Sequence, residues 1–300
     1  MPKKIILRFC GSSRQNPNTQ DILEESLPQI LWLASFPKSG NTWVRIFLHN
    51  YLWGLSEPQD INDLGLVSGD SDLRWWRSLT DTPTQLKSAD VLRLRPQVQA
   101  MLAASDQGDI IAKTHFPVYD SKNKMMFDFA VGAGAIYILR NPLDVCLSLA
   151  RFWDSSLDRT IAFMAADDFH GNDKEDGVWE FYGNWSRHVE SWTKTGECGI
   201  LALRYEDLLQ DPLANFGRLA GFLDGRNPDP TRLENAVNFS SFDRLKRAED
   251  AAGFKGQGAE GRPFFRKGQA GEGAKVLTKT QIDRVVRDHG EVMQKFGYLP

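Results

Sequence analysis

Short apolar runs alternate with amphipathic segments along the first two thirds of the chain. The first run covers residues 29–36 and ends at Pro37, and residues 41–53 follow it with aliphatic and aromatic side chains at helical spacing. This pattern predicts a strand, a tight loop and a helix. Similar apolar runs cover residues 109–112, 135–139 and 199–203, and helical patterns over 142–153 and from Tyr205 onward follow the last two. Because strands that alternate with helices pair in parallel, we expect an α/β fold with a central parallel sheet flanked by helices.

The chain after residue 177 also shows helical spacing. Residues 178–193 place several large side chains on one side of a predicted helix, where we interpret them as core. These side chains are Trp179, Phe181, Tyr182, Trp185, Val189 and Trp192. Further helices are predicted over residues 212–223, 230–238 and 278–296. Residues 251–275 hold seven glycines, and a loop of that length is usually functional or mobile.

The domain organisation follows from the absence of dividing features. No internal repeat, low-complexity tract or linker interrupts the 300 residues, which predicts one domain. The start of the chain differs, because residues 10–21 are polar and contain glycine, asparagine and proline. We expect residues 1–25 to form a loosely ordered arm and residues 26–300 to form the domain.

Composition narrows the partners and the compartment. A net charge of -3 and a pI near 6.0 predict no general attraction to nucleic acid or to acidic membranes. Cys10, Cys146 and Cys198 are widely spaced and outside any metal-ligand pattern, so neither a disulfide framework nor a zinc site is indicated. No apolar stretch has the length of a secretory signal or a membrane span. We therefore expect a cytoplasmic protein, without nucleic-acid or membrane partners, in which any anion site is built locally.

The loop between the first strand and its helix offers a cradle for an anion. Gly40 lets the backbone approach an anion closely, Lys38 supplies a positive charge, and backbone N–H groups gather at the positive end of the helix. Ser39, Asn41 and Thr42 offer further hydrogen bonds to oxygen. In the P-loop NTPases the lysine follows the last glycine, and the serine or threonine after it holds magnesium. Because Lys38 precedes Gly40 here, we expect a site that relies on protein cations and no metal ion.

Six segments, in order along the chain, resemble those of the cytosolic sulfotransferases. Residues 36–43, Phe-Pro-Lys-Ser-Gly-Asn-Thr-Trp, resemble the 5'-phosphosulfate loop of that family. The other five are Lys-Thr-His at 113–115, the segment 137–148, Arg-Tyr-Glu-Asp-Leu at 204–208, Ser-Ser-Phe at 240–242 and Phe-Arg-Lys-Gly at 265–268. The resemblance implies a single α/β domain with a P-loop-like strand, loop and helix, and a donor bound at the strand ends.

The resemblance also implies which residues hold the donor, 3'-phosphoadenosine 5'-phosphosulfate (PAPS), and its product adenosine 3',5'-bisphosphate (PAP). The 5' side is held by Lys38, Ser39, Gly40, Asn41 and Thr42. The 3'-phosphate is held by Arg140, Ser148, Arg266, Lys267 and Gly268. The adenine ring is enclosed by Trp43 and Phe242 and bordered by Tyr205 and Ser240. Stacking on such aromatic faces contributes roughly 1–3 kcal/mol per base. Taken singly, Arg140 and Ser148 are more typical of a surface arginine and a helical serine, and Phe242 is as typical of core as of an adenine site.

The predicted catalytic set is His115, Lys38, Lys113 and Ser148. A neutral histidine, with an ordinary pKa near ~6.5, can take the proton that the acceptor loses, and the resemblance assigns this task to His115. Lys38 meets the leaving phosphate oxygen. Lys113 lies on the same face of an extended segment as His115, and it neutralises the sulfuryl oxygens or steadies the donor. We interpret the remaining histidines as structural or solvated; they are His49, His170, His188 and His289.

The acceptor is the least determined part of the prediction. We expect a small alcohol, phenol or amine, but residues 55–95 and 152–178 match no specific pattern. Their large aromatic side chains form either an apolar acceptor pocket or part of the core. These are Trp75, Trp76, Phe152, Trp153 and Phe169. No copy of the Lys-Thr-Val-Glu dimerisation motif of many animal members is present, so the oligomeric state stays open.

Two other functions stay open at this point. A P-loop-type phosphotransferase would use the same strand, loop and helix but would need ATP and magnesium. A non-catalytic protein that binds adenosine bisphosphate would keep the donor site without turnover. The chain also departs from the family after Gly268, because residues 271–275 read Gly-Glu-Gly-Ala-Lys where Gly-Asp-Trp-Lys is common.

Overall fold

A computed structural model gives the structure of the chain. It describes residues 30–64, 67–104, 110–129, 132–171, 178–196, 199–225, 227–256 and 262–299. The predicted arm over residues 1–25 and its boundary at residue 26 lie outside the described residues and stay predictions. No helix in these ranges is both long enough and apolar enough to cross a membrane.

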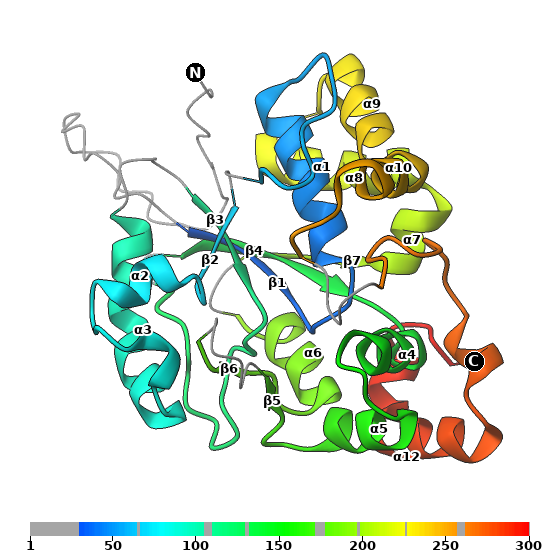
Figure 1. Cartoon of the computed structure of the whole chain (residues 1–300). Helices are drawn as coiled ribbons and strands as arrows, with labels where there is room; N and C mark the ends of the chain where they lie inside the picture. Colours follow the sequence, from blue (N-terminus) through cyan, green and yellow to red (C-terminus); the bar gives the residue numbers. More distant parts are fainter. Residues whose placement is uncertain are drawn as a thin grey trace, which may run out of the picture.

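A parallel sheet forms the centre of the molecule (Figure 1). Within the described residues its five strands run in the order β2-β3-β1-β4-β7, and every neighbouring pair is parallel. The strands are β1 (Ile30–Ser35), β2 (Val67–Gly69), β3 (Ile110–Thr114), β4 (Gly132–Leu139) and β7 (Ile200–Arg204). The predicted α/β fold with a parallel sheet is confirmed. The short strand β2 comes from a segment for which the sequence pattern predicted no element.

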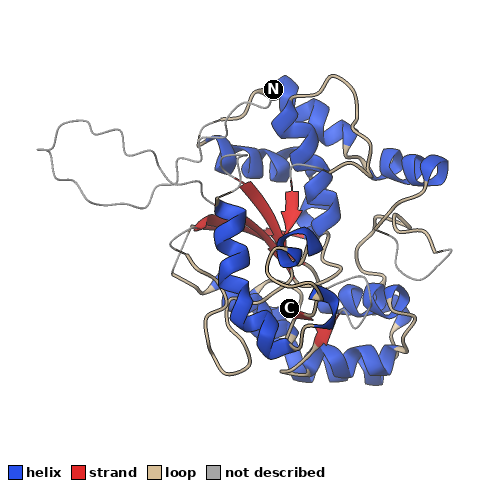
Figure 2. Ribbon diagram, turned by 60° about the vertical axis from the view of Figure 1, so that its left-hand side comes forward, coloured by secondary structure: helices blue, strands red, loops and turns tan. Residues whose placement is uncertain are grey.

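Helices occupy most of the remaining chain, and Figure 2 shows them on both sides of the sheet. Up to residue 165 the helices are α1 (Asn41–Trp53), α2 (Leu73–Arg77), α3 (Ser88–Ala103), α4 (Pro142–Phe152) and α5 (Leu157–Ala165). After it they are α6 (Trp185–Thr193), α7 (Tyr205–Gln210), α8 (Pro212–Asp224), α9 (Pro230–Phe239), α10 (Phe242–Ala252), α11 (Gly273–Val276) and α12 (Lys279–Lys295). A 3₁₀ turn covers Pro83–Gln85, and β5 (His170–Gly171) pairs antiparallel with β6 (Glu180–Phe181).

Alternate residues of β1 point to two separate cores. Leu31 and Leu33 face the layer of α1, α8 and α9, where they pack in one cluster with residues such as Phe47 and Phe216. Trp32 points to the opposite face, which is covered by α3, α4, α6 and α12. All six residues of β1 are buried, as expected for a central strand of a parallel sheet with both faces covered.

Local signals explain where many of these helices begin. Asn141 accepts a hydrogen bond from the N–H of Leu143 at the start of α4, whose first residue is a proline. The same pairing of a polar cap with proline begins α8 and α9. Thr278 and Gln281 form a capping box at the start of α12. The helices predicted over residues 41–53, 142–153, 212–223, 230–238 and 278–296 are confirmed to within a residue or two.

The prediction of one helix over residues 178–193 is wrong in its first half. Residues 180–181 form β6, Gly183 has a φ of 62°, and α6 begins at Trp185 with Asn184 as its cap. The left-handed conformation at Gly183 turns the chain between strand and helix. As a result Tyr182 is not part of a helical face but lines a cleft beyond the sheet.

The glycine-rich segment is shorter than predicted. Helix α10 continues to Ala252, and α11 begins at Gly273. Residues 257–261 of the predicted loop lie outside the described residues.

Candidate active site

A cleft of about 1270 Å³ opens at the carboxyl edge of the sheet. Its walls come from the loop after β1, the end of β3, helix α4, strand β6 and the segment over residues 262–272. Because the strands are parallel, their carboxyl ends meet at this edge. The cleft brings together most of the predicted site residues: Lys38, Gly40, Asn41, Thr42, Trp43, Lys113, His115, Arg140, Ser148, Tyr205, Phe242, Arg266, Lys267 and Gly268.

The loop after β1 has the tight backbone of an anion-binding turn. Lys38 has a φ of 66° and Gly40 a φ of 108°, both in the left-handed region. A Cβ atom at Gly40 would lie 2.6 Å from the ring of Tyr205, so a side chain at this position would collide. Glycine therefore lets the loop pass against Tyr205 and turn directly into α1.

The Ser39 side chain lies behind the loop. Ser39 is 1% exposed, and among the described residues its Oγ has no hydrogen-bond partner. Asn41 donates to the carbonyl of Leu33 and to Ser35 Oγ, both at 3.2 Å, and so ties the start of α1 to the end of β1. Asn41 lines the cleft, whereas Ser39 does not.

The ammonium group of Lys38 lies between two aromatic rings. Its Nζ is 4.1 Å from the ring centroid of Phe152 and 4.1 Å from that of Phe264. Burial, with a smaller contribution from the Arg140 charge, lowers the pKa of Lys38 to about 7. A bound anion would favour the charged form and raise this pKa again.

Arg140 connects the loop after β1 to the end of β4. Its Nη1 donates to the carbonyl of Lys38 at 3.1 Å, and its guanidinium carbon is 4.3 Å from the ring centroid of Tyr205. Within the described residues its buried Nε has no hydrogen-bond partner. Ser148 lines the same cleft from α4.

Trp43 and Phe242 contribute aromatic walls. Trp43 donates through Nε1 to the carbonyl of Ser240 at 2.8 Å, and its ring meets Tyr205 edge-on at 5.6 Å. Phe242 lies under the backbone of Gly268, where an added Cβ would be 2.4 Å from the Phe242 ring. The Ser240 hydroxyl donates to the carbonyl of Ala236 at 2.7 Å and does not line the cleft.

The Glu272 carboxylate pairs with two cations of the glycine-rich segment and with one of α4. Glu272 forms ion pairs with Lys267 at 2.7 Å, with Arg151 at 3.4 Å and with Arg266. Partial burial would raise the pKa of Glu272, but the hydrogen bonds from these three cations lower it to about 2. Neither Arg151 nor Glu272 was predicted as a site residue. The sequence marked this place only by a departure from the family pattern: residues 272–273 are Glu-Gly where Asp-Trp is common.

His115 is oriented by the end of β1. Its Nδ1 is 2.8 Å from the carbonyl of Ser35, which can only accept a hydrogen bond, so Nδ1 carries the proton and Nε2 keeps its lone pair. Burial, together with the Lys113 charge, lowers the pKa of His115 to about 3. The ring is therefore neutral at physiological pH, which is the state that a general base requires.

His188 supports His115 from α6. Its Nε2 donates to the carbonyl of His115 at 3.0 Å, and its Nδ1 accepts from the Tyr137 hydroxyl at 2.9 Å. His188 is fully buried, as the structural interpretation of this residue expected. His49 and His289 are buried as well, whereas His170 lies in β5 and lines the cleft.

Lys113 meets a carboxylate that the sequence analysis missed. Its Nζ is 3.7 Å from Glu180 Oε1. Glu180 is 7% exposed and also accepts hydrogen bonds from the hydroxyl groups of Ser71 and Tyr182. No local pattern marked Glu180, because it belongs to the segment that was predicted as helix.

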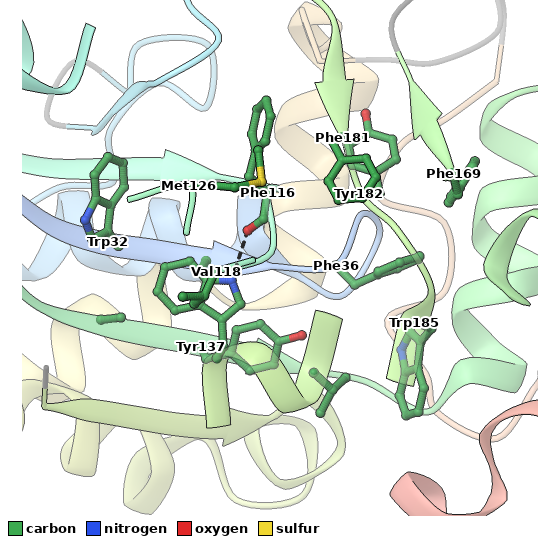
Figure 3. Packing of buried hydrophobic residues seen from close by; sticks show 14 of the residues in the cluster. Trp32, Phe36, Phe116, Val118, Met126, Tyr137, Phe169, Phe181, Tyr182 and Trp185 are labelled. Atoms are coloured by element: carbon green, nitrogen blue, oxygen red, sulfur yellow. Dashed lines mark hydrogen bonds between the residues drawn. The ribbon is translucent and has the colours of Figure 1, made fainter. Parts of the chain in front are cut away.

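The predicted acceptor aromatics divide into two groups. Phe152, Trp153 and Phe169 line the cleft. Trp76 is fully buried and donates to the carbonyl of Asp70, so it belongs to the core, against which the partly buried Trp75 packs. Figure 3 shows Phe36, Tyr182 and Phe169 gathered beyond the tip of β1, where Phe36 lies 6.2 Å from Phe169 and 6.5 Å from Tyr182.

Comparison with known proteins places the chain in a family. The sulfotransferase domain family matches residues 28–297. Sulfotransferase 1B1 of Mus musculus is 26% identical over 286 residues, covering 87% of this chain and 81% of that protein. Cytosolic sulfotransferase 17 of Arabidopsis thaliana is 26% identical over 319 residues, covering 99% of this chain and 85% of that protein.

Solved structures show a similar fold. The crystal structure of mouse sulfotransferase SULT7A1 complexed with PAP matches with a TM-score of 0.59 at 18% identity, covering 89% of this chain and 85% of that one. At this identity the likeness concerns the fold alone. Since the family match spans nearly the whole chain, the protein belongs to the sulfotransferase domain family and is a sulfotransferase-family enzyme.

Proposed function

We propose that the protein transfers the sulfuryl group of PAPS to a hydroxyl or amine of a small-molecule acceptor. The observation that carries the proposal is that Lys38, Arg140 and His115, which follow three different strands, meet in one cleft. Two of these side chains are cations suited to phosphate oxygens, and the third is a neutral base with a free Nε2. A cleft of this kind suits transfer of a charged group to a neutral nucleophile.

The side chains present fit the chemistry of the donor. Lys38, Arg140, Arg266 and Lys267 line the cleft and provide cations for the anionic groups of the donor. The N-terminus of α1, a helix of 13 residues, adds backbone N–H groups. Trp43 and Phe242 offer ring faces to a base. We propose these groups, with Ser39, Gly40, Asn41, Thr42, Ser148, Tyr205, Ser240 and Gly268, as the donor site; Ser39 and Ser240 contribute through their backbone and through packing, because their hydroxyl groups are buried.

The donor supplies an activated sulfuryl group, and the chain supplies charge and a base. The acceptor oxygen or nitrogen forms a bond to sulfur while the bond from sulfur to the bridging phosphate oxygen breaks. The acceptor proton moves to His115 Nε2, and the Lys38 ammonium neutralises the charge that develops on the leaving oxygen. Lys113 and Ser148 complete the proposed catalytic set, with Lys113 facing the sulfuryl oxygens.

The acceptor end of the cleft favours a compact apolar molecule. Phe152, Trp153, Phe169 and Tyr182 line it. Such a surface excludes water and contacts apolar carbon atoms closely. We propose a small alcohol, phenol or amine as acceptor. We also propose a cytoplasmic location, which is supported by the cytosolic relative from Arabidopsis thaliana.

Calorimetric titration in EDTA tests the donor assignment. We expect tight binding of PAP without metal and weak binding of ATP. Arg140→Ala should weaken PAP binding at least about tenfold, because it removes a charge-assisted phosphate contact. Arg287→Ala, which removes an exposed arginine on α12, should leave the affinity unchanged. A preference for ATP restored by magnesium would instead indicate a phosphotransferase.

A transfer assay tests the reaction. The wild-type protein is incubated with PAPS labelled at sulfur and with a phenol, an aliphatic alcohol and a primary amine. Label on at least one acceptor is the expected result. Tight PAP binding without transfer to any of the three would identify a non-catalytic binding protein.

A further inference from the structure

Glu180 is a buried carboxylate at the wall of the cleft. It is the first residue of β6, lines the cleft and is 7% exposed. A carboxylate buried to this degree needs hydrogen bonds and a positive partner to stay ionised. The contacts of Glu180 therefore indicate the role of its negative charge.

The partners of Glu180 come from three segments that are far apart in the sequence. The Ser71 hydroxyl, just after β2, donates to Oε1, and the Tyr182 hydroxyl donates to Oε2 at 2.8 Å. The ammonium of Lys113, on β3, is 3.7 Å from Oε1. Burial acts to raise the pKa of Glu180, but the Lys113 charge and the hydrogen bonds from the two hydroxyl groups lower it below its ordinary value. The carboxylate is thus a fixed negative charge at neutral pH.

The carboxylate is held rigidly through Tyr182. Gly171 of β5 faces this ring so closely that an added Cβ would be 2.5 Å from the Tyr182 hydroxyl. The ring also stacks on Trp153, with centroids 6.2 Å apart and an angle of 19°. A hydrogen bond from an immobile hydroxyl leaves Glu180 few alternative rotamers.

Lys113 has a fixed backbone but a long side chain. Its carbonyl accepts from the N–H of Asp70 at 3.2 Å, and the next residue, Thr114, donates to the Asp70 carboxylate at 2.8 Å. Arg95 pairs with the same carboxylate from α3. These contacts fix β3 up to the Cα of Lys113, whereas the ammonium lies four methylene groups farther on, at the end of a flexible stem. Among the ion pairs within the described residues, Lys113 makes one, and its partner is Glu180.

We propose that Glu180 is a positioning residue for the transfer reaction, which holds the Lys113 ammonium at the side of the cleft where His115 lies. The inference rests on the proposed function. Without this carboxylate the ammonium would leave the cleft wall for solvent, because it is hydrated more favourably there. The separation of 3.7 Å is longer than that of a tight ion pair, so the ammonium can turn toward a sulfuryl oxygen without losing the attraction of Glu180.

Four titratable groups lie around Lys113, and they come from its own segment and from the segments that pack against it. They are Glu180 on β6, His115 on the same segment, Asp70 after β2, and Tyr182 after β6. Asp70 is already paired with Arg95 in the core. Of these groups, Glu180 is the carboxylate that pairs with the Lys113 ammonium at the cleft wall.

The test compares Glu180→Gln with wild type in the sulfuryl-transfer assay. Glutamine keeps the shape and can still accept from Ser71 or Tyr182, but it loses the charge. We expect kcat to fall about 10- to 100-fold, the effect typical of groups that orient a reacting residue, while PAP affinity stays within about twofold. Asp224→Asn is the matched control: it also removes a carboxylate that accepts a tyrosine hydroxyl, from Tyr51 at 2.6 Å, but outside the cleft.

A double-mutant cycle separates positioning from mere support of the fold. If Glu180 acts through Lys113, then Glu180→Gln should lower kcat several-fold less in a Lys113→Met background than in wild type. An equal loss in both backgrounds would overturn the inference. If Glu180→Gln does not fold, Glu180→Asp replaces it in the cycle: the shorter side chain draws the carboxylate away from Lys113 and should lower kcat, and an equal loss in the Lys113→Met background would overturn the inference.

The activity of wild type distinguishes this inference from the proposed function. A wild-type protein without transfer activity on any acceptor overturns the proposed function, and the inference falls with it. An active wild type with an equally active, folded Glu180→Gln variant overturns the inference alone.

Discussion

At the scale of single residues, one hydrogen bond fixes the orientation and the tautomer of His115. Its Nδ1 donates to the carbonyl of Ser35 at 2.8 Å, across 80 positions of sequence. This bond leaves Nε2 available and keeps the ring in one tautomer. In the proposed reaction His115 acts as an oriented base, and a side chain of similar size should preserve the fold without the base.

Replacement of His115 tests this assignment. His115→Gln can keep a hydrogen bond to Ser35 but cannot take a proton, so we expect kcat to fall roughly 10²–10⁴-fold with PAP affinity nearly unchanged. Transfer assays and calorimetry on the same preparation measure both quantities. His289→Gln, which changes a buried histidine outside the cleft, should keep the wild-type kcat. Unchanged turnover in His115→Gln would remove this residue from the mechanism.

At the scale of elements, the segment before α11 is attached to the start of α4. The buried carboxylate of Asp144 accepts from the N–H of Gly271 at 2.7 Å and from that of Gly273 at 2.6 Å. Gly273 packs so tightly that an added Cβ would lie 2.3 Å from the carbonyl carbon of Leu143. Because Glu272 lies between the two glycines, this attachment also places the cluster of Arg151, Arg266 and Lys267.

Gly273→Ala should therefore weaken donor binding. A methyl group cannot be accommodated against the backbone of α4, so the segment must move and lose hydrogen bonds to Asp144, each worth about 1.5–3 kcal/mol for a charged acceptor. We expect PAP affinity to fall about tenfold or more in calorimetry. Gly199→Ala is the control, because nothing lies within 4 Å of an added Cβ there. Equal PAP affinity in the two variants would show that the position of this segment does not matter for the donor.

At the scale of the whole molecule, buried neutral histidines connect protonation to folding. Burial lowers the pKa of His188 from 6.5 to about 4 and, even with Asp288 nearby, that of His289 from 6.5 to about 4. His115 follows the same pattern with a pKa of about 3. A histidine whose folded pKa is depressed contributes its stability fully above the unfolded pKa, and loses it as the pH falls toward the folded value. The loss should thus occur between about pH 6.5 and pH 4.

Urea denaturation as a function of pH measures this loss. We expect the free energy of unfolding to decrease from about pH 7 to about pH 5, because the unfolded chain binds more protons than the folded one. His289→Gln removes one of these groups. Over this interval the unfolding free energy of the variant should therefore decrease less than that of wild type, by on the order of 1–2 kcal/mol. If the unfolding free energies of the two proteins changed in parallel with pH, His289 would have the same pKa in the folded and unfolded chain.

The local sequence pattern predicted the elements that nearby residues determine. The apolar run before Pro37 and the helical spacing after Asn41 predicted β1 and α1, and helical spacing likewise predicted α4, α8 and α9. These predictions succeeded because strand and helix preferences depend on neighbours within a few positions. The order of the short motifs was likewise a property of the chain alone, and it indicated the family and the donor site before any contact was known.

The tertiary structure decided everything that depends on contacts between distant segments. It placed Glu180 against Lys113 and Ser71, residues from three separate segments, and it turned the hydroxyl of Ser240 away from the cleft. It also replaced the first half of the helix predicted over residues 178–193 with β6, whose pairing partner is β5. The spacing of apolar residues could not distinguish a strand from a helix here, since large apolar side chains are buried in both. The physical reason is that burial and pairing energies come from residues many positions away, and only the folded chain brings those residues together.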